Sequence, residues 1–272
     1  MGTIAEKLTY LNETKNAIKE AIVNKGVSVN DSDTFRSYAD KISSIEAGGG
    51  SGGDAEVEAS FISSIDNSLG ANVTKLPSSL TSIGSRAFYQ STNLALTKLP
   101  SGVTSIGDYA FYGCSKLALT ELPNGITSIG RNAFQTCGKI TLIKLPSNLT
   151  SVGNNAFEYC SKLALTELPS SLTSIGDVSF GSCSLIVSLD IKGDVTNIGD
   201  GAFRSCSNLA TVIFPNVTSV PKLGGTTVFQ STPIAKGTGY IYVPDALVES
   251  FKTAIRWTTY ANQIKGLSEL ES

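Results

Sequence analysis

Residues 112–134 read YGCSKLALTELPNGITSIGRNAF, and nearly the same 23-residue phrase occupies residues 89–111 and 158–180. A Leu-Pro pair keeps the same phase in each copy, so that Leu76 and Leu99 are 23 residues apart. A single short coil cannot bury its apolar edge, and it must therefore share that edge with identical neighbours. The repeat predicts a solenoid of stacked coils.

Three further residue types recur in the same phase. The glycines are Gly84, Gly107, Gly130, Gly153, Gly176 and Gly199. The phenylalanines are Phe88, Phe111, Phe134, Phe157, Phe180 and Phe203. The cysteines are Cys114, Cys137, Cys160, Cys183 and Cys206. Periods of about 20–29 residues with spaced leucines are typical of leucine-rich repeats. We expect Leu-Pro to end a strand and Ile-Gly to turn a corner, because glycine tolerates positive φ. We expect Ala-Phe to begin a short helical turn whose ring points inward.

The segments LPSSLTSIGSRAF (residues 76–88) and YGCSKLALTELP (residues 112–123) resemble the BspA-like, cysteine-containing leucine-rich repeat of bacterial surface and phage proteins. The resemblance covers roughly residues 60–220. It implies an extended, curved body that is used for binding, and it brings no catalytic residues with it.

The predicted fold is an α+β repeat solenoid, a right-handed leucine-rich-repeat coil with an N-terminal helical hairpin and a C-terminal strand-helix cap. We divide the chain into a helical module (residues 1–46), a Gly/Ser linker (47–54), a solenoid that includes an atypical first coil (55–220) and a cap (221–272). Residues 1–46 carry apolar residues at helical spacing and resemble a helical module at the start of phage tail-associated proteins. In the cap we expect a strand and then a helix from Pro244-Asp245, with one apolar face formed by Leu247, Phe251 and Ile255 and another by Trp257, Tyr260 and Ile264.

Composition argues against several functions. Charged residues make up 16% of the chain and the net charge is −2, so nothing attracts nucleic acid, and no apolar run is long enough for membrane insertion. Histidine is absent, which removes the commonest general base and zinc ligand. Asp108, Asp177 and Asp200 follow the repeat glycines and read as solvated turn carboxylates rather than paired catalytic acids. We therefore expect no catalytic site, cofactor or metal.

The cysteines are interpreted as part of the scaffold. Their 23-residue spacing places one thiol in each coil, and no C-x2-C pair suitable for zinc is present. Because free cysteine is among the residue types most often buried, a buried ladder is favoured over redox or metal chemistry.

We predict a non-enzymatic binding or adhesion protein, phage- or prophage-encoded and tail-associated, that recognises a protein or cell-surface glycan of a bacterial host. The alternative is a structural spacer with no ligand of its own. No signal peptide is visible, so the expected location is a phage virion or a bacterial cell surface, with the cytoplasm as the alternative. We expect residues 1–46 to self-associate or to dock on a partner.

The candidate binding surface rests on a shift in register. Counted from the leucine position that lies three residues after each cysteine, the family pattern wants inward residues at the first, fourth and sixth places, and Leu189 and Val212 obey it. Earlier coils place a leucine third: Leu96, Leu119, Leu142 and Leu165. Either a bulge returns these leucines to the core, or they form an exposed apolar stripe that would bind a ligand. Beside them, charges alternate in sign and should pair across coils: Lys98, Glu121, Lys144 and Glu167.

Overall fold

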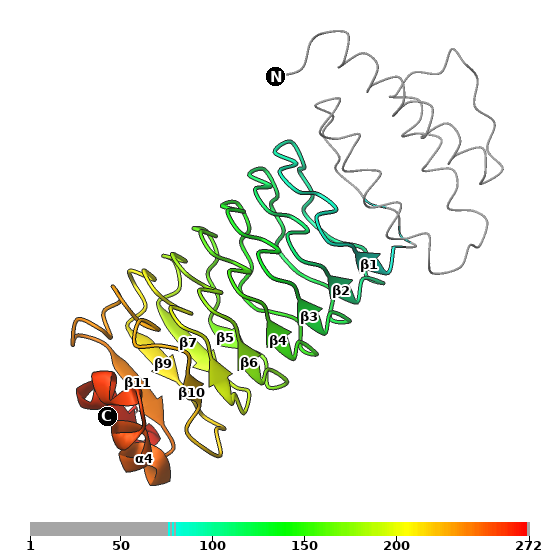
Figure 1. Cartoon of the computed structure of the whole chain (residues 1–272). Helices are drawn as coiled ribbons and strands as arrows, with labels where there is room; N and C mark the ends of the chain where they lie inside the picture. Colours follow the sequence, from blue (N-terminus) through cyan, green and yellow to red (C-terminus); the bar gives the residue numbers. More distant parts are fainter. Residues whose placement is uncertain (1–75, 77, 79, 271–272) are drawn as a thin grey trace, which may run out of the picture.

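The computed structural model describes residues 76, 78 and 80–270, which form a β-solenoid of stacked coils (Figure 1). The predicted helical module (1–46), the linker (47–54) and the atypical first coil lie outside the described residues. One face is a seven-stranded parallel sheet built from the Ser-Ile segment of each coil: β1 (Ser82–Ile83), β2 (Ser105–Ile106), β3 (Ser128–Ile129), β4 (Ser151–Val152), β6 (Ser174–Ile175), β8 (Asn197–Ile198) and β10 (Lys222–Leu223).

A second parallel sheet occupies another face of the later coils, in the order β12-β11-β9-β7-β5. Its strands are β5 (Glu167–Leu168), β7 (Ser188–Ile191), β9 (Thr211–Ile213), β11 (Tyr240–Val243) and β12 (Ile264–Gly266). The helices of the described residues all belong to the C-terminal cap: η2 (Asp245–Leu247), α4 (Val248–Thr253), η3 (Trp257–Gln263) and η4 (Leu267–Glu269). The repeats themselves are β and turn, which corrects the α+β expectation to a β-solenoid.

A stack of phenylalanine rings runs through the core. Successive rings from Phe88 to Phe203 are 5.2–5.6 Å apart with planes within 12° of parallel, and Phe229 extends the stack at 5.7 Å. Every ring in it is fully buried. The expected inward phenylalanine ladder is confirmed, and it continues beyond residue 220.

The segment around each phenylalanine is not the helical turn that the sequence suggested. Arg86 and Gln90 have φ values of 59° and 57°, and the same two positions are left-handed in later coils. As a result, alternate amides leave the coil: Arg86 N–H donates to Asp108 O and Phe88 N–H to Ala110 O, both in the next coil. A helix would keep these bonds inside one coil, whereas here they tie neighbouring coils together.

The repeat glycines serve a different purpose from the one predicted. Positive φ among the described glycines occurs at Gly113, Gly201 and Gly237, not at the glycine that follows each Ser-Ile strand. A Cβ on Gly153 would lie 2.7 Å from the backbone nitrogen of Arg131, one coil away. These glycines are needed because adjacent backbones approach too closely for any side chain.

The cysteine ladder is confirmed as buried and reduced. All five cysteines are fully buried, and none of them forms a disulfide within the described residues. Each Sγ donates to the carbonyl of a phenylalanine in the preceding coil, at 2.9–3.2 Å. Burial raises the pKa of Cys160 and Cys206 from 9.0 to about 12, and it also raises the pKa of Cys137 and Cys183. Thiolate, the reactive form, is therefore scarce at neutral pH.

We accordingly expect N-ethylmaleimide to label less than one thiol per native chain and all five after denaturation, because the reagent needs an accessible thiolate. Labelling is followed by intact mass. Rapid native labelling of more than one cysteine contradicts the buried ladder.

Ser179 breaks the alanine column that precedes the phenylalanines. Its hydroxyl is fully buried and finds no hydrogen-bond partner among the described residues. Neighbouring coils carry Ala156 and Ala202 at this place. Ser179→Ala should raise the free energy of unfolding by about 1–3 kcal/mol. The reason is that the buried hydroxyl has given up its hydrogen bonds to water on folding and has gained none within the protein. Urea denaturation measures the change. Ala156→Ser is the matched reverse substitution, and a gain in stability from it contradicts this account.

The C-terminal cap follows the prediction in part. The expected strand is β11, and Phe251, Trp257 and Tyr260 are buried as expected. Ile255 is 86% exposed, so its predicted inward position is wrong. The reason is that α4 ends at Thr253, before the helical face reaches that residue.

After α4 the chain turns at Arg256, which has a φ of 70°. The Arg256 guanidinium donates to the carbonyls of Leu223 and Gly224, and the Trp257 indole N–H donates to Pro221 O at 2.7 Å. These donors satisfy carbonyls at the last strand of the seven-stranded sheet, which has no further coil to pair with. The cap therefore closes this end of the solenoid in hydrogen bonding as well as in apolar contact.

Candidate functional site

The four leucines at the third place belong to the core. Leu96, Leu119, Leu142 and Leu165 are at most 1% exposed. The first-place and sixth-place residues of the same coils are buried as well, so the backbone must bring side chains inward at non-alternating positions. The core alternative is confirmed, and the exposed apolar stripe is wrong.

Because of this arrangement, the coils with a third-place leucine lose regular strand pairing on this face. The coils with a fourth-place apolar residue form proper strands, in which Leu189 of β7 is paired with Val212 of β9. In the described coils before β5, the strand pairing on this face is reduced to one β-bridge, Lys144↔Glu167, and scattered backbone hydrogen bonds, such as that from Ala118 N–H to Leu96 O at 3.0 Å. The register shift of the leucines thus divides the face into an irregular half and a sheet half.

Charged side chains lie on the outer side of this face. Lys98 and Glu121 form an ion pair of 2.9 Å between neighbouring coils, and both side chains are largely exposed, so the pair adds little stability. Glu167 pairs with Lys192 of the following coil rather than with Lys144. The hydrogen bond to Glu167 raises the pKa of Lys192.

Lys144 is therefore left out of the expected ladder. It lies between Glu121 and Glu167 along the stack, and both carboxylates have another lysine as partner. No ion pair of Lys144 is found within residues 80–270. The alternating pairing predicted from the sequence holds for Lys98 with Glu121 and fails for Lys144.

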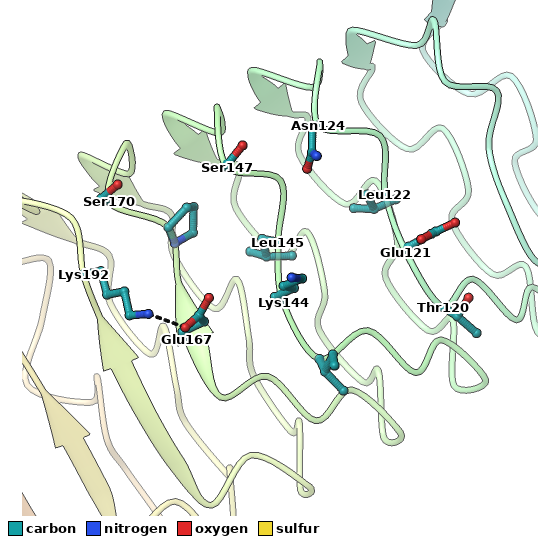
Figure 2. A pocket seen from close by; sticks show the side chains of 12 residues that line it. Thr120, Glu121, Leu122, Asn124, Lys144, Leu145, Ser147, Glu167, Ser170 and Lys192 are labelled. Carbon is teal, nitrogen blue, oxygen red and sulfur yellow. Dashed lines mark hydrogen bonds and ion pairs between the residues drawn. The ribbon is translucent and has the colours of Figure 1, made fainter.

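A depression of about 670 Å³ opens where the irregular half meets the sheet half (Figure 2). It is lined by Thr120, Glu121, Leu122, Asn124, Ile143, Lys144, Leu145, Ser147, Glu167, Pro169, Ser170 and Lys192. Three members of the predicted surface meet here, namely Glu121, Lys144 and Glu167, while Lys98 is outside the lining and the four leucines lie beneath the face. Ile143 is 60% exposed, whereas the other apolar residues of the lining are buried or half-buried, so Ile143 is the main apolar contact that this surface offers.

Sequence reasoning missed Ile143 and the polar column Asn124, Ser147 and Ser170. Both signals were present in the repeat phase. Ile143 replaces the threonine that Thr120 and Thr166 represent in the adjacent coils, and the polar column stands two residues after each Leu-Pro leucine. Because the neighbouring coils carry threonine at this exposed position, the scaffold does not require an apolar residue there.

The aspartates after the repeat glycines are not simply solvated. Asp108 Oδ1 accepts the backbone N–H of Arg131 at 2.7 Å, and Asp177 Oδ1 accepts that of Asp200 at 2.8 Å. Each carboxylate binds the equivalent residue one coil further on. These two carboxylates therefore have a structural role, because they tie neighbouring coils together.

Two other classes of site are absent from the described residues. In the described part of the chain, no group of three or more Asp, Glu, Cys or His side chains is arranged to hold a metal ion. Among the same residues, no helix has the length and apolar character needed to cross a bilayer.

Comparison with known proteins agrees with this architecture. A leucine-rich repeat protein from Bacteroides ovatus is similar, with 31% identity over 64% of this chain and 44% of that protein, and a TM-score of 0.55. The leucine-rich repeat protein of T. pallidum is 34% identical over 52% of this chain and 64% of its own, with a TM-score of 0.45. This chain thus spans less than half of the first protein and less than two thirds of the second. No curated protein matches the chain.

The family assignment rests on the repeats. The BspA type leucine rich repeat region matches in six copies, over residues 66–186 and 127–238, which together cover more than half of the chain. The periods, the phenylalanine stack and the buried cysteine column agree with that match. The chain belongs to the BspA-type leucine-rich repeat family.

Proposed function

We propose that this protein is a non-enzymatic binding protein that recognises a protein or cell-surface glycan of a bacterial host at the depression around Lys144. The observation that carries the proposal is the combination of an exposed isoleucine and an unpaired lysine within a hollow of about 670 Å³. Surface apolar groups next to an uncommitted charge suit a ligand that offers an apolar contact and an anion.

The electrostatics of the hollow support an acidic group on the ligand. Glu121 and Glu167 are each engaged by a lysine, which leaves Lys144 as the cation available to a partner. Asn124, Ser147 and Ser170 add hydrogen-bonding groups along one side. The scaffold beneath is fixed by buried leucines, so the surface is held ready for binding without reorganisation.

A paired substitution tests this proposal. Lys144→Glu reverses the charge of the unpaired lysine. Ile143→Thr introduces the residue type that the neighbouring coils carry at this position, as Thr120 and Thr166. We expect the double variant to bind intact bacterial cells or purified cell walls at least tenfold more weakly than the parent chain, as loss of one charge pair and one apolar contact implies. Lys162→Glu, an exposed charge outside the depression, is the matched control.

The alternative function, a structural spacer, is an outcome of the same experiment. If the parent chain binds neither cells nor cell walls nor glycan arrays, the chain presents no ligand surface and the spacer reading replaces the binding reading. If binding persists unchanged in the double variant, the ligand site lies elsewhere on the molecule.

The proposed setting is a phage tail or a bacterial surface, and the support for it is the sequence resemblance of residues 1–46 and of the repeats. In this setting residues 1–46 attach the protein through self-association or through a partner. A truncation that starts at Asp54 should sediment as a smaller assembly than the full chain at equal mass concentration. Equal assembly states argue against self-association, and gene neighbourhood tests the phage origin.

A further inference from the structure

A cluster of aromatic and cationic side chains lies on another part of the coils, next to the phenylalanine stack. Tyr89 and Tyr112 directly follow Phe88 and Phe111, and their rings stack with centroids 5.0 Å apart and planes within 9°. The ring of Tyr109 lies against both, at 6.3 Å from Tyr89 and 5.9 Å from Tyr112. We refer to these three tyrosines together with Arg86 and Arg131 as the tyrosine–arginine cluster.

The two arginines of the cluster converge on one ring. The guanidinium carbons of Arg86 and Arg131 lie 5.5 Å and 5.4 Å from the centroid of Tyr109. Arg131 also donates to the Tyr109 hydroxyl at 2.7 Å. Within residues 80–270 neither guanidinium forms an ion pair, and both residues are exposed. The nearby Asp108 directs Oδ1 to the backbone N–H of Arg131 instead.

The backbone of the cluster is in a demanding conformation. Arg86 and Tyr109 have φ values of 59° and 58°, at a position where the next two coils carry Asn132 and Asn155. Asparagine tolerates left-handed φ better than most residues, whereas arginine and tyrosine are strained there. The scaffold imposes this conformation at the same place in every coil, so it does not itself call for arginine or tyrosine there.

We propose that the tyrosine–arginine cluster binds a carbohydrate chain that carries carboxylates, as a chain of uronic acids does. The C–H groups of a sugar ring bear partial positive charge and pack on the negative face of an aromatic ring. A guanidinium holds a carboxylate through two parallel hydrogen bonds. Arg86, Tyr109 and Arg131 come from three successive coils, so the cluster follows the solenoid axis and suits a linear ligand.

An acidic peptide is the less favourable occupant. It would supply carboxylates for the arginines, but it lacks the ring C–H faces that match three grouped tyrosines. Two of the strands beside the cluster are paired on both sides, β2 with β1 and β3, and β3 with β2 and β4, so a peptide could not add its backbone next to them.

The test is titration calorimetry of the full chain with a linear oligomer of galacturonic acid. A neutral galactose oligomer of equal length and a polyglutamate peptide are the comparison ligands. We expect binding of the galacturonate oligomer that weakens with added salt, and about tenfold lower affinity for the variant with Arg86→Gln and Arg131→Gln. Tyr109→Asn, which installs the residue of the next coils, should weaken binding several-fold while keeping thermal stability.

Lys236→Gln removes an exposed charge outside the cluster and should leave the affinity unchanged. The proposal is overturned if the parent chain binds no galacturonate oligomer, or if the neutral oligomer binds equally well. It is also overturned if polyglutamate binds in place of the sugar, or if the arginine and tyrosine variants retain full affinity. The depression variants around Lys144 do not touch this cluster, so the two binding proposals fail or succeed separately.

Discussion

A chain carrying Leu119→Asp and Leu142→Asp should fail to fold. Both leucines are fully buried in adjacent coils, and each substitution places a carboxylate among the apolar side chains of the core. The two substitutions bury two unpaired charges and remove the apolar contacts of two leucines. Their combined free-energy cost should exceed the usual stability of a domain, about 5–15 kcal/mol. Circular dichroism and sedimentation of the purified chain measure the outcome.

The matched control uses the exposed neighbours of the same two leucines. Thr120→Asp and Thr141→Asp introduce the same two charges one residue away, on the solvent side of the chain. This control should fold and unfold cooperatively, close to the parent chain. A folded double-leucine variant with a cooperative transition would mean that these side chains are not in the core, contrary to their burial in the structure.

Much of the fold could be predicted because the repeat supplies the same information many times. A residue type that recurs every 23 positions must occupy equivalent places in a stack, so the inward phenylalanines and buried thiols follow from phase alone. The register of the leucine-bearing segment did not follow. One shifted leucine per coil can be accommodated by flipping outward or by bending the backbone, and only the packing around Leu119 and Leu142 decides between these options.

Conformational detail was also beyond the pattern. A conserved phase for glycine is compatible with positive φ or with close backbone approach, and Gly153 is required for the second reason. The end of α4 at Thr253 was equally invisible, because an apolar residue at helical spacing predicts burial only while the helix continues. Ile255 lies just past that end and is exposed.

The candidate site was predictable in location but not in its pairing. The sequence placed Glu121, Lys144 and Glu167 on one face, and they do line one depression. Which lysine pairs with Glu167 depends on side-chain reach between coils, and Lys192 was outside the predicted set because it occupies the proline position of its coil rather than the charged position. Lys144 has no ion-pair partner because Glu167 pairs with Lys192 and Glu121 pairs with Lys98.

Phe157→Ala should lower the free energy of unfolding by about 3–5 kcal/mol, the range measured for removing a buried aromatic side chain. Phe157 lies mid-stack, with Phe134 at 5.2 Å and Phe180 at 5.6 Å, so the substitution leaves a cavity and breaks two ring contacts. In a linear array each coil contacts only its neighbours, and a weak coil in the middle separates the two halves. Urea denaturation should therefore show a lower midpoint and a shallower or split transition.

Phe157→Leu provides the comparison for that experiment, because it keeps an apolar side chain at the site and removes the ring stacking. We expect it to lose less stability than Phe157→Ala and to keep a single transition, since the coil remains filled. If Phe157→Ala unfolds within about 1 kcal/mol of the parent chain, the ring stack is not what joins the coils. The inter-coil hydrogen bonds, such as Phe157 N–H to Ser179 O at 2.8 Å, would then carry the cooperativity of the solenoid.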